Sequence, residues 1–88
     1  MIPSFLIDIN RERKASLLVP FFKNNEKILD FGCGDMSLSR SIKEKNPSLS
    51  IVGVDIVVSK TRPRNFKFVA YDGKKLPFKD KSFDAVFA

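Results

Sequence analysis

The sequence predicts an α/β fold: a Rossmann-like, mostly parallel sheet with flanking helices, truncated after its fourth strand. Three observations predict it. Short apolar runs alternate with a segment of helical period, which is typical of parallel βαβ units. The second run, residues 51–54, is apolar throughout, as in a strand that is covered on both faces. Aspartates lie at or just past the ends of three of the runs, at the edge where such sheets bind ligands.

The first 26 residues are predicted to be a helical segment ahead of the sheet. Asn10 is a candidate cap for a helix over residues 11–19. Pro20 should bend or end that helix, because proline lacks the N–H that a helix interior needs. Residues 27–88 then form the rest of one domain.

The remaining elements follow from apolar runs and from the residues that interrupt them. The predicted strands are residues 27–31, 50–54, 67–70 and 83–87, and a helix over residues 35–45 joins the first two. Only residues 56–65 link the second and third strands, which is shorter than a usual crossover. Arg62 and Pro63 also argue against a regular helix there, so one face of the sheet is expected to be thinly covered.

Composition limits the classes of function. The 88 residues make at most one small domain, and 43% hydrophobic residues support a packed core. With one cysteine, Cys33, and no histidine, the chain offers no internal disulfide, no zinc site and no Ser-His-Asp triad. We therefore expect no metal and a reducing, cytoplasmic setting.

Charge and hydropathy indicate which partners to expect. No stretch approaches the roughly 20 apolar residues that cross a bilayer, so we expect no membrane span. The net charge of +6 is compatible with nucleic acid or an anionic surface. An ordinary lysine-rich face is favoured, because no aromatic stacking motif accompanies the charges.

The turn after the first strand is the strongest candidate site. It reads DFGCGD over residues 30–35, and its glycines let a backbone approach a ligand closely. A dinucleotide would rest its pyrophosphate on the start of the next helix, but Asp30 and Asp35 would repel it. Ser37 also stands where the third glycine of the dinucleotide fingerprint falls. A ligand with an amino group and a sulfonium fits better, although Asp35 can also serve as a helix cap.

Asp55 marks the end of the second strand. It lies about 20 residues past the glycine turn, where an acid can accept hydrogen bonds from both hydroxyls of a ribose. The alternative is a solvated aspartate at a strand end.

Three segments together resemble the class I S-adenosylmethionine (SAM)-dependent methyltransferases of the small-molecule type with a Leu-Pro-Phe motif. They are ILDFGCGD at 28–35, VGVDI at 52–56 and YDGKKLPFKDKSFDAVF at 71–87. The resemblance implies SAM as cofactor and a chain that is the N-terminal, cofactor-binding half of a single methyltransferase domain. It specifies neither the methyl acceptor nor any catalytic residue.

The resemblance also implies a site. Its cofactor-binding residues would be Asp30, Phe31, Gly32, Cys33, Gly34, Asp55, Ile56, Asp72 and Gly73. The glycine turn with Asp30 would hold the methionine part of SAM, and Asp55 would hold the ribose. Ile56 and Asp72, with Gly73 beside it, would contact the adenine, although Asp72 can also cap its own loop.

Two departures from the family pattern and two alternatives stay open. Met36 occupies the position of the family's third glycine, and the chain supplies four of the family's seven strands. An exposed fourth strand with apolar Phe83, Val86 and Phe87 would invite self-association. The alternatives are a non-catalytic SAM-binding or partner-subunit module and, less favoured, an NAD-binding Rossmann half.

Overall fold

The computed structural model describes residues 4–61 and 65–88, and their elements follow the predicted order. They are α1 (Ser4–Leu18), a 3-10 turn η1 (Val19–Phe21), β1 (Lys27–Phe31), α2 (Ser37–Lys45), β2 (Ser50–Asp55), β3 (Lys67–Ala70) and β4 (Ala85–Phe87). The predicted α/β class is confirmed.

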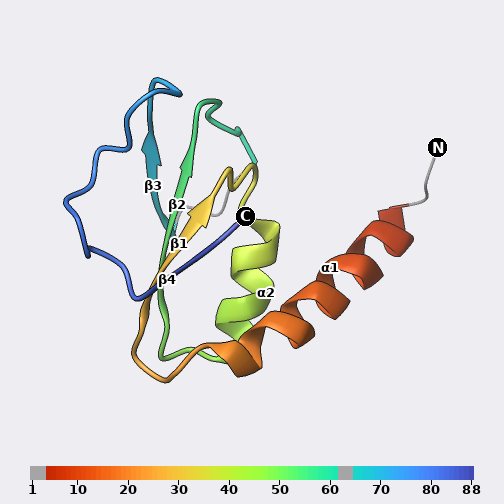
Figure 1. Ribbon diagram of the computed structural model, residues 1–88. Coiled ribbons are helices and arrows are strands. Elements are labelled where there is room, and N and C mark those ends of the chain that lie inside the picture. Colours follow the sequence, from red (N-terminus) through yellow and green to blue (C-terminus); the bar gives the residue numbers. More distant parts are fainter. Residues whose placement is uncertain (1–3, 62–64) are drawn as a thin grey trace.

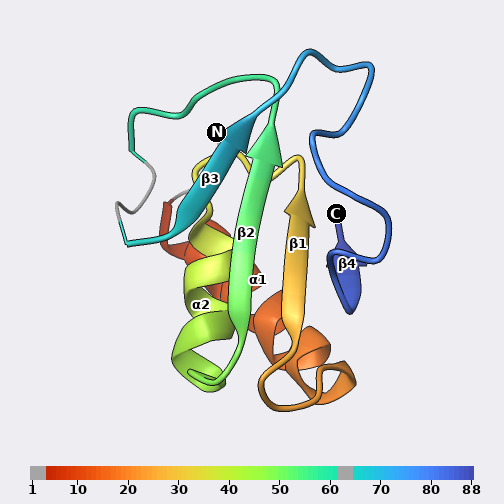
Figure 2. The same cartoon turned by 90° about the vertical axis from the view of Figure 1, so that its left-hand side faces the viewer.

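The four strands form one sheet in the order β3-β2-β1-β4, and every neighbouring pair is parallel. β1 and β2 are the two inner strands, with Asp30 opposite Gly53 and Phe31 opposite Val54. All carboxyl ends therefore meet at one edge of the sheet. Figures 1 and 2 show α1 and α2 on the same side of the sheet, while the segment between β3 and β4 passes on the other side.

Three predicted boundaries are wrong. The first helix begins at Ser4, so the predicted cap Asn10 lies inside it; residues 4–9 contain neither glycine nor proline to stop it. α2 begins at Ser37 rather than at residue 35, because Met36 before it has a left-handed backbone with φ 61°. β4 begins at Ala85 rather than at residue 83.

The late start of β4 follows from contacts that the two residues before it make. Asp84 makes two hydrogen bonds to Lys27 at the start of β1. Its backbone N–H donates to the Lys27 carbonyl at 2.8 Å, and its carboxylate accepts the Lys27 N–H at 2.7 Å. The Phe83 ring packs edge-on against Phe78, with 5.0 Å between ring centroids. The chain is thus anchored by side chains just before regular pairing begins. The end of the first helix is as predicted, since Pro20 falls within η1.

The core lies between the sheet and the two helices. Its buried members are Ala15, Ile28, Met36, Ile42, Leu49, Ile51, Phe66 and Phe87. α1 is tied to α2 by Glu12, whose carboxylate accepts the Ser41 hydroxyl at 2.7 Å and pairs with Lys45 at 3.1 Å. These two bonds hold α1 against α2.

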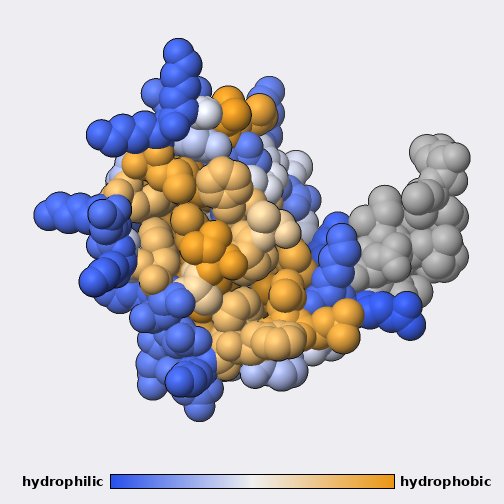
Figure 3. All heavy atoms as spheres, in the orientation of Figure 1, coloured by the Kyte–Doolittle hydropathy of each residue, from blue (hydrophilic) through white to orange (hydrophobic). Residues whose placement is uncertain are grey.

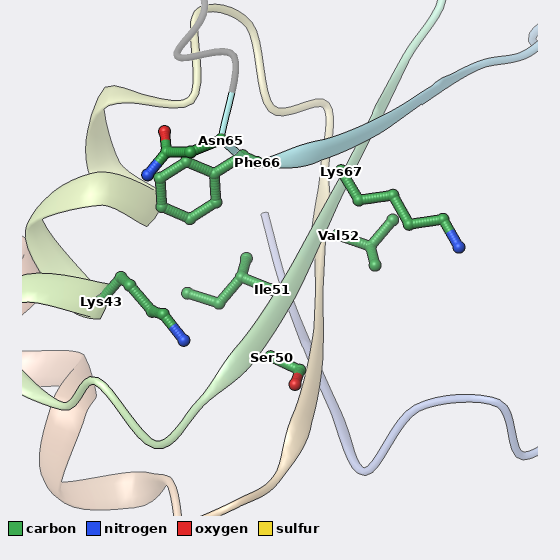
Figure 4. Close-up of a pocket in the computed structure, with 7 residues that line it drawn as sticks. All are labelled: Lys43, Ser50, Ile51, Val52, Asn65, Phe66 and Lys67. Atoms are coloured by element: carbon green, nitrogen blue, oxygen red, sulfur yellow. The ribbon is translucent and has the colours of Figure 1, made fainter.

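The connection between β2 and β3 is thin, as predicted. Its described residues, 56–61 and 65–66, contain neither helix nor strand; the Arg62 and Pro63 prediction lies outside the described residues. Phe66 is buried and closes part of the space beside α2. A cavity of about 320 Å³ remains at the amino ends of β2 and β3, where Figure 4 shows Phe66 and Ile51 facing Lys43 of α2.

Candidate functional site

The glycine turn folds back over the end of β2. Gly32 and Gly34 both have positive φ angles, 71° and 55°, which residues with a Cβ rarely adopt. The N–H groups of Gly32 and Cys33 donate to the carbonyl of Val54, at 2.8 and 3.1 Å. Because both donors use one acceptor on the neighbouring strand, the turn is held against β2 at the carboxyl edge of the sheet.

Asp55 joins this turn from the end of β2. One carboxylate oxygen, Oδ2, accepts the Gly34 N–H at 2.9 Å, and Oδ1 accepts the Ile56 N–H at 2.7 Å. These bonds, led by that from Gly34, hold the pKa of Asp55 below its ordinary value. A carboxylate oxygen accepts more than one hydrogen bond, so each oxygen keeps capacity for a ligand hydroxyl. The structure therefore brings the predicted ribose acid and the glycine turn together.

Asp30 lies beneath the turn, on the side of the sheet that faces α2. It is 5% exposed, and its Oδ2 accepts the Ser39 hydroxyl at 2.6 Å. Burial raises the pKa of Asp30, the Ser39 hydrogen bond opposes that rise, and the nearby charge of Asp55 adds to it. Two carboxylates that repel each other beside one turn favour a cationic ligand over a phosphate.

The start of α2 is already occupied by a carboxylate. Asp35 Oδ1 accepts the Ser37 N–H at 3.0 Å and also the Ser37 hydroxyl, which holds the pKa of Asp35 below its ordinary value. The Ser37 N–H is one of the donors that a bound pyrophosphate would use at a helix start. Asp35 thus satisfies the first helical N–H of α2, although Met36 is the residue at the N-cap position.

The residues predicted to contact adenine come together beyond β2 and β3. A Cβ built on Gly73 would lie 3.0 Å from Ile56 Cδ1, so the two residues are neighbours across the ends of these strands. Ile56 is 58% exposed. Asp72 is exposed and accepts the N–H groups of Lys74 and Lys75 at 2.8 and 3.1 Å, which lowers its pKa. Asp72 caps its loop in this way while staying open to solvent.

Phe31 and Cys33 complete the predicted set. Phe31 is 38% exposed at the end of β1, with its ring centroid 6.1 Å from that of Tyr71. Cys33 is half-buried, and its thiol lies 3.7 Å from the Gly34 carbonyl. All nine predicted residues therefore lie at the carboxyl edge of the sheet, at the ends of β1, β2 and β3.

Sequence reasoning missed two residues of this region. Ser39 holds the Asp30 carboxylate, and the signal was its place three residues before Ile42, on the face of α2 that packs on the sheet. Tyr71 packs beside Phe31, and its N–H donates to the Asp55 carbonyl at 3.2 Å. No spacing in the sequence pairs Tyr71 with Phe31, because Phe31 ends β1 and Tyr71 follows β3.

Elsewhere in the described chain, one prediction about the sheet edge needs correction. Phe87 is buried and packs near Phe22, at 6.1 Å between ring centroids, so it is not part of an exposed edge. Val86 is 60% exposed, as predicted. Neither α1 nor α2, the α-helices of residues 4–61 and 65–88, has the length and apolar character needed to cross a bilayer.

Comparison with known proteins gives consistent matches. A family model described as a methyltransferase domain matches residues 28–88. A demethylmenaquinone methyltransferase of Thermotoga maritima is 35% identical over 91 residues, which cover 97% of this chain and 39% of that protein. A demethylmenaquinone methyltransferase of Thermus thermophilus is 32% identical over 92 residues, covering 94% of this chain and 41% of that protein. The chain thus spans about two fifths of the length of these curated relatives.

The family match and the fold agree on the same region. The matched residues begin in β1, include the glycine turn and the end of β2, and continue through β4. They make up more than half of the chain, and both relatives carry the same activity in their names. The chain therefore belongs to the class I SAM-dependent methyltransferase family.

Proposed function

We propose that this chain is the SAM-binding portion of a methyltransferase. The observation that carries the proposal is the Asp55 carboxylate, which is hydrogen-bonded to Gly34 of the glycine turn and to Ile56 beyond β2. An acid held in this way can accept both ribose hydroxyls of a nucleoside while the turn receives the rest of the molecule.

The charges of the site suit the other parts of SAM. The methionine part carries an amino group beside a sulfonium, and it would lie at the glycine turn above Asp30, with Phe31 and Cys33 at its sides. The buried Asp30 charge and its repulsion by Asp55 would both be relieved by a nearby cation. The adenine would lie against Ile56, near Asp72 and Gly73. Together these residues would hold the cofactor from end to end.

SAM supplies a methyl group on a positively charged sulfur. The residues of this chain would bind and orient that group, and the gain in rate comes from holding the acceptor in line with it. A base is needed only when the acceptor carries a proton to lose. None of the nine site residues is proposed to act as that base.

Ligand competition tests the proposal against the NAD alternative. Calorimetry of the 88-residue chain should show binding of SAM and of S-adenosylhomocysteine (SAH) and weaker binding of NAD. The reason is that Asp35 occupies the Ser37 N–H at the start of α2, where a pyrophosphate would need donors. Tighter binding of NAD than of SAH would contradict the proposal.

Demethylmenaquinone is the first acceptor to test, because both relatives are named for methylating it. The readout is SAH release from a protein that contains this chain, with demethylmenaquinone or other acceptors supplied. The acceptor is a proposal from the relatives alone, since the site proposed in this chain is the one for the cofactor. A cytoplasmic location likewise stays a prediction from the single cysteine.

A second candidate function is a non-catalytic partner subunit. Figure 3 shows a broad hydrophobic area on the side of the molecule where β4 forms the edge of the sheet. Val86 in β4, with Leu17 and Phe21 at the end of the first helical segment, is among the exposed apolar residues. Such a surface favours association with another protein surface. A natural product of this length that binds SAH but supports no turnover in its complex would favour this candidate.

A further inference from the structure

Met36 is the residue of the glycine turn whose conformation is hardest to explain from its side chain. Its backbone is left-handed, with φ 61° and ψ 22°, a conformation that costs a residue with a Cβ and that glycine adopts freely. The Met36 side chain is nonetheless fully buried. A strained position that is filled by a large buried side chain needs a compensating contact.

That contact lies beneath the turn, on β2. A Cβ built on Gly53 would lie 2.7 Å from Met36 Sδ, Met36 Cε and Cys33 Sγ. The Met36 thioether therefore rests against the bare backbone of Gly53, and no larger residue fits at 53 without moving it. The Met36 N–H also donates to the Cys33 carbonyl at 2.9 Å, which closes the turn from below.

The position of this contact connects it to the ligand site. Gly53 pairs with Asp30 on β1 and is two residues before Asp55. Gly34, whose N–H reaches Asp55, lies between Cys33 and Met36 in the chain, and the side chains of Cys33 and Met36 both reach the Gly53 position. A side chain packed there fixes the height of the turn above β2, and with it the direction of the Gly34 N–H.

We propose that Met36 is a positioning residue for the cofactor, acting as a peg between the glycine turn and Gly53. The inference rests on the proposed function, because the turn that Met36 supports is the one assigned to SAM. Packing of the peg holds the turn in its binding shape before the ligand arrives, which lowers the cost of ordering the turn on binding. The chain thus uses a buried thioether where a third glycine would leave the turn unsupported.

Three variants test the peg. Met36→Gly removes the side chain and relieves the left-handed strain, and Met36→Leu keeps a similar apolar volume. The control Leu49→Ala truncates an equally buried side chain just before the amino end of β2, away from the turn. The probe is SAH binding by calorimetry, together with amide hydrogen exchange at Gly34 without ligand. We expect Met36→Gly to bind SAH about tenfold more weakly and to exchange faster at Gly34. Met36→Leu should restore both, and Leu49→Ala should change neither at a temperature where it is folded.

The outcomes separate this inference from the proposed function. A wild-type chain that binds no SAH contradicts the proposed function and overturns the inference with it. A wild-type chain that binds SAH, beside a folded Met36→Gly variant of equal affinity, overturns the inference alone. If Met36→Gly does not fold, Gly53→Ala displaces the peg from the other side, and unchanged SAH affinity in that variant would also overturn the inference.

Discussion

Replacing Asp55 with alanine is the sharpest test of the candidate site. The change removes the two carboxylate oxygens that accept the Gly34 and Ile56 N–H groups at 2.9 and 2.7 Å. It also removes the acceptors proposed for the ribose hydroxyls. Hydrogen bonds to a charged group are worth roughly 1.5–3 kcal/mol, so SAH affinity should fall roughly 10- to 150-fold.

Two matched variants separate ligand contacts from general effects. Asp55→Asn keeps one acceptor oxygen and should cost less than Asp55→Ala. In the asparagine variant, the amide NH₂ must face one of the two backbone N–H groups, so its affinity should still fall below the wild-type value. Asp80→Ala removes the same charge from an exposed position in the loop before β4 and should leave affinity unchanged.

Titration calorimetry with SAH measures all four proteins, and thermal unfolding checks that each is folded at the temperature used. Equal affinity of the wild type and Asp55→Ala would place the ribose elsewhere and refute the assignment. A loss in Asp80→Ala as large as that in Asp55→Ala would attribute the effect to net charge instead.

Three further predictions follow from other residues of the structure. Asp30→Asn should raise Tm at neutral pH by roughly 4–8 °C, the shift for about 1 kcal/mol in a domain of this size, yet weaken SAM binding by removing a charge under the turn. Folding raises the pKa of Asp30, so the folded state binds more protons than the unfolded state. The free energy of unfolding of the wild type should therefore fall as pH rises from the ordinary aspartate pKa through the raised value. This dependence on pH should be smaller in Asp30→Asn. Gly73→Ala should weaken SAH binding several-fold, because the added Cβ would lie 3.0 Å from Ile56 Cδ1 at a φ of 84°. The control Lys74→Ala should leave the affinity unchanged. Equal affinities of Gly73→Ala and the wild type would remove Gly73 from the adenine site. Val86→Lys should reduce any self-association measured by sedimentation over a concentration series, and an unchanged series would show that the β4 edge is not the contact.

Much of the architecture could be predicted because it depends on local pattern. The runs that became β1, β2 and β3 are short, apolar and bounded by turn residues, and their bounds were predicted to within one residue. Helix ends were harder, because α1 runs through its predicted cap at Asn10 and α2 begins only after the left-handed Met36. The start of β4 depends on the bonds between Asp84 and Lys27, which no local pattern encodes.

The sequence by itself determined which residues gather at the site. Parallel strands place their carboxyl ends at one edge, so Asp30, Asp55 and Asp72, at or just past the ends of neighbouring strands, had to lie there once the order of elements was known. The glycines at 32 and 34 marked the turn for the same local reason, since the φ angles there are ones that a Cβ disfavours.

Only the tertiary structure decided what each of these groups does. The bond from Gly34 to Asp55 joins residues 21 apart in the chain, and the Ser39 hydroxyl that holds Asp30 comes from the helix packed on the sheet. The place of the Met36 side chain depends on the bare backbone of Gly53 on a neighbouring strand. Burial, repulsion between carboxylates and close packing all depend on distances through space, and those distances exist only after β1, β2 and α2 have come together.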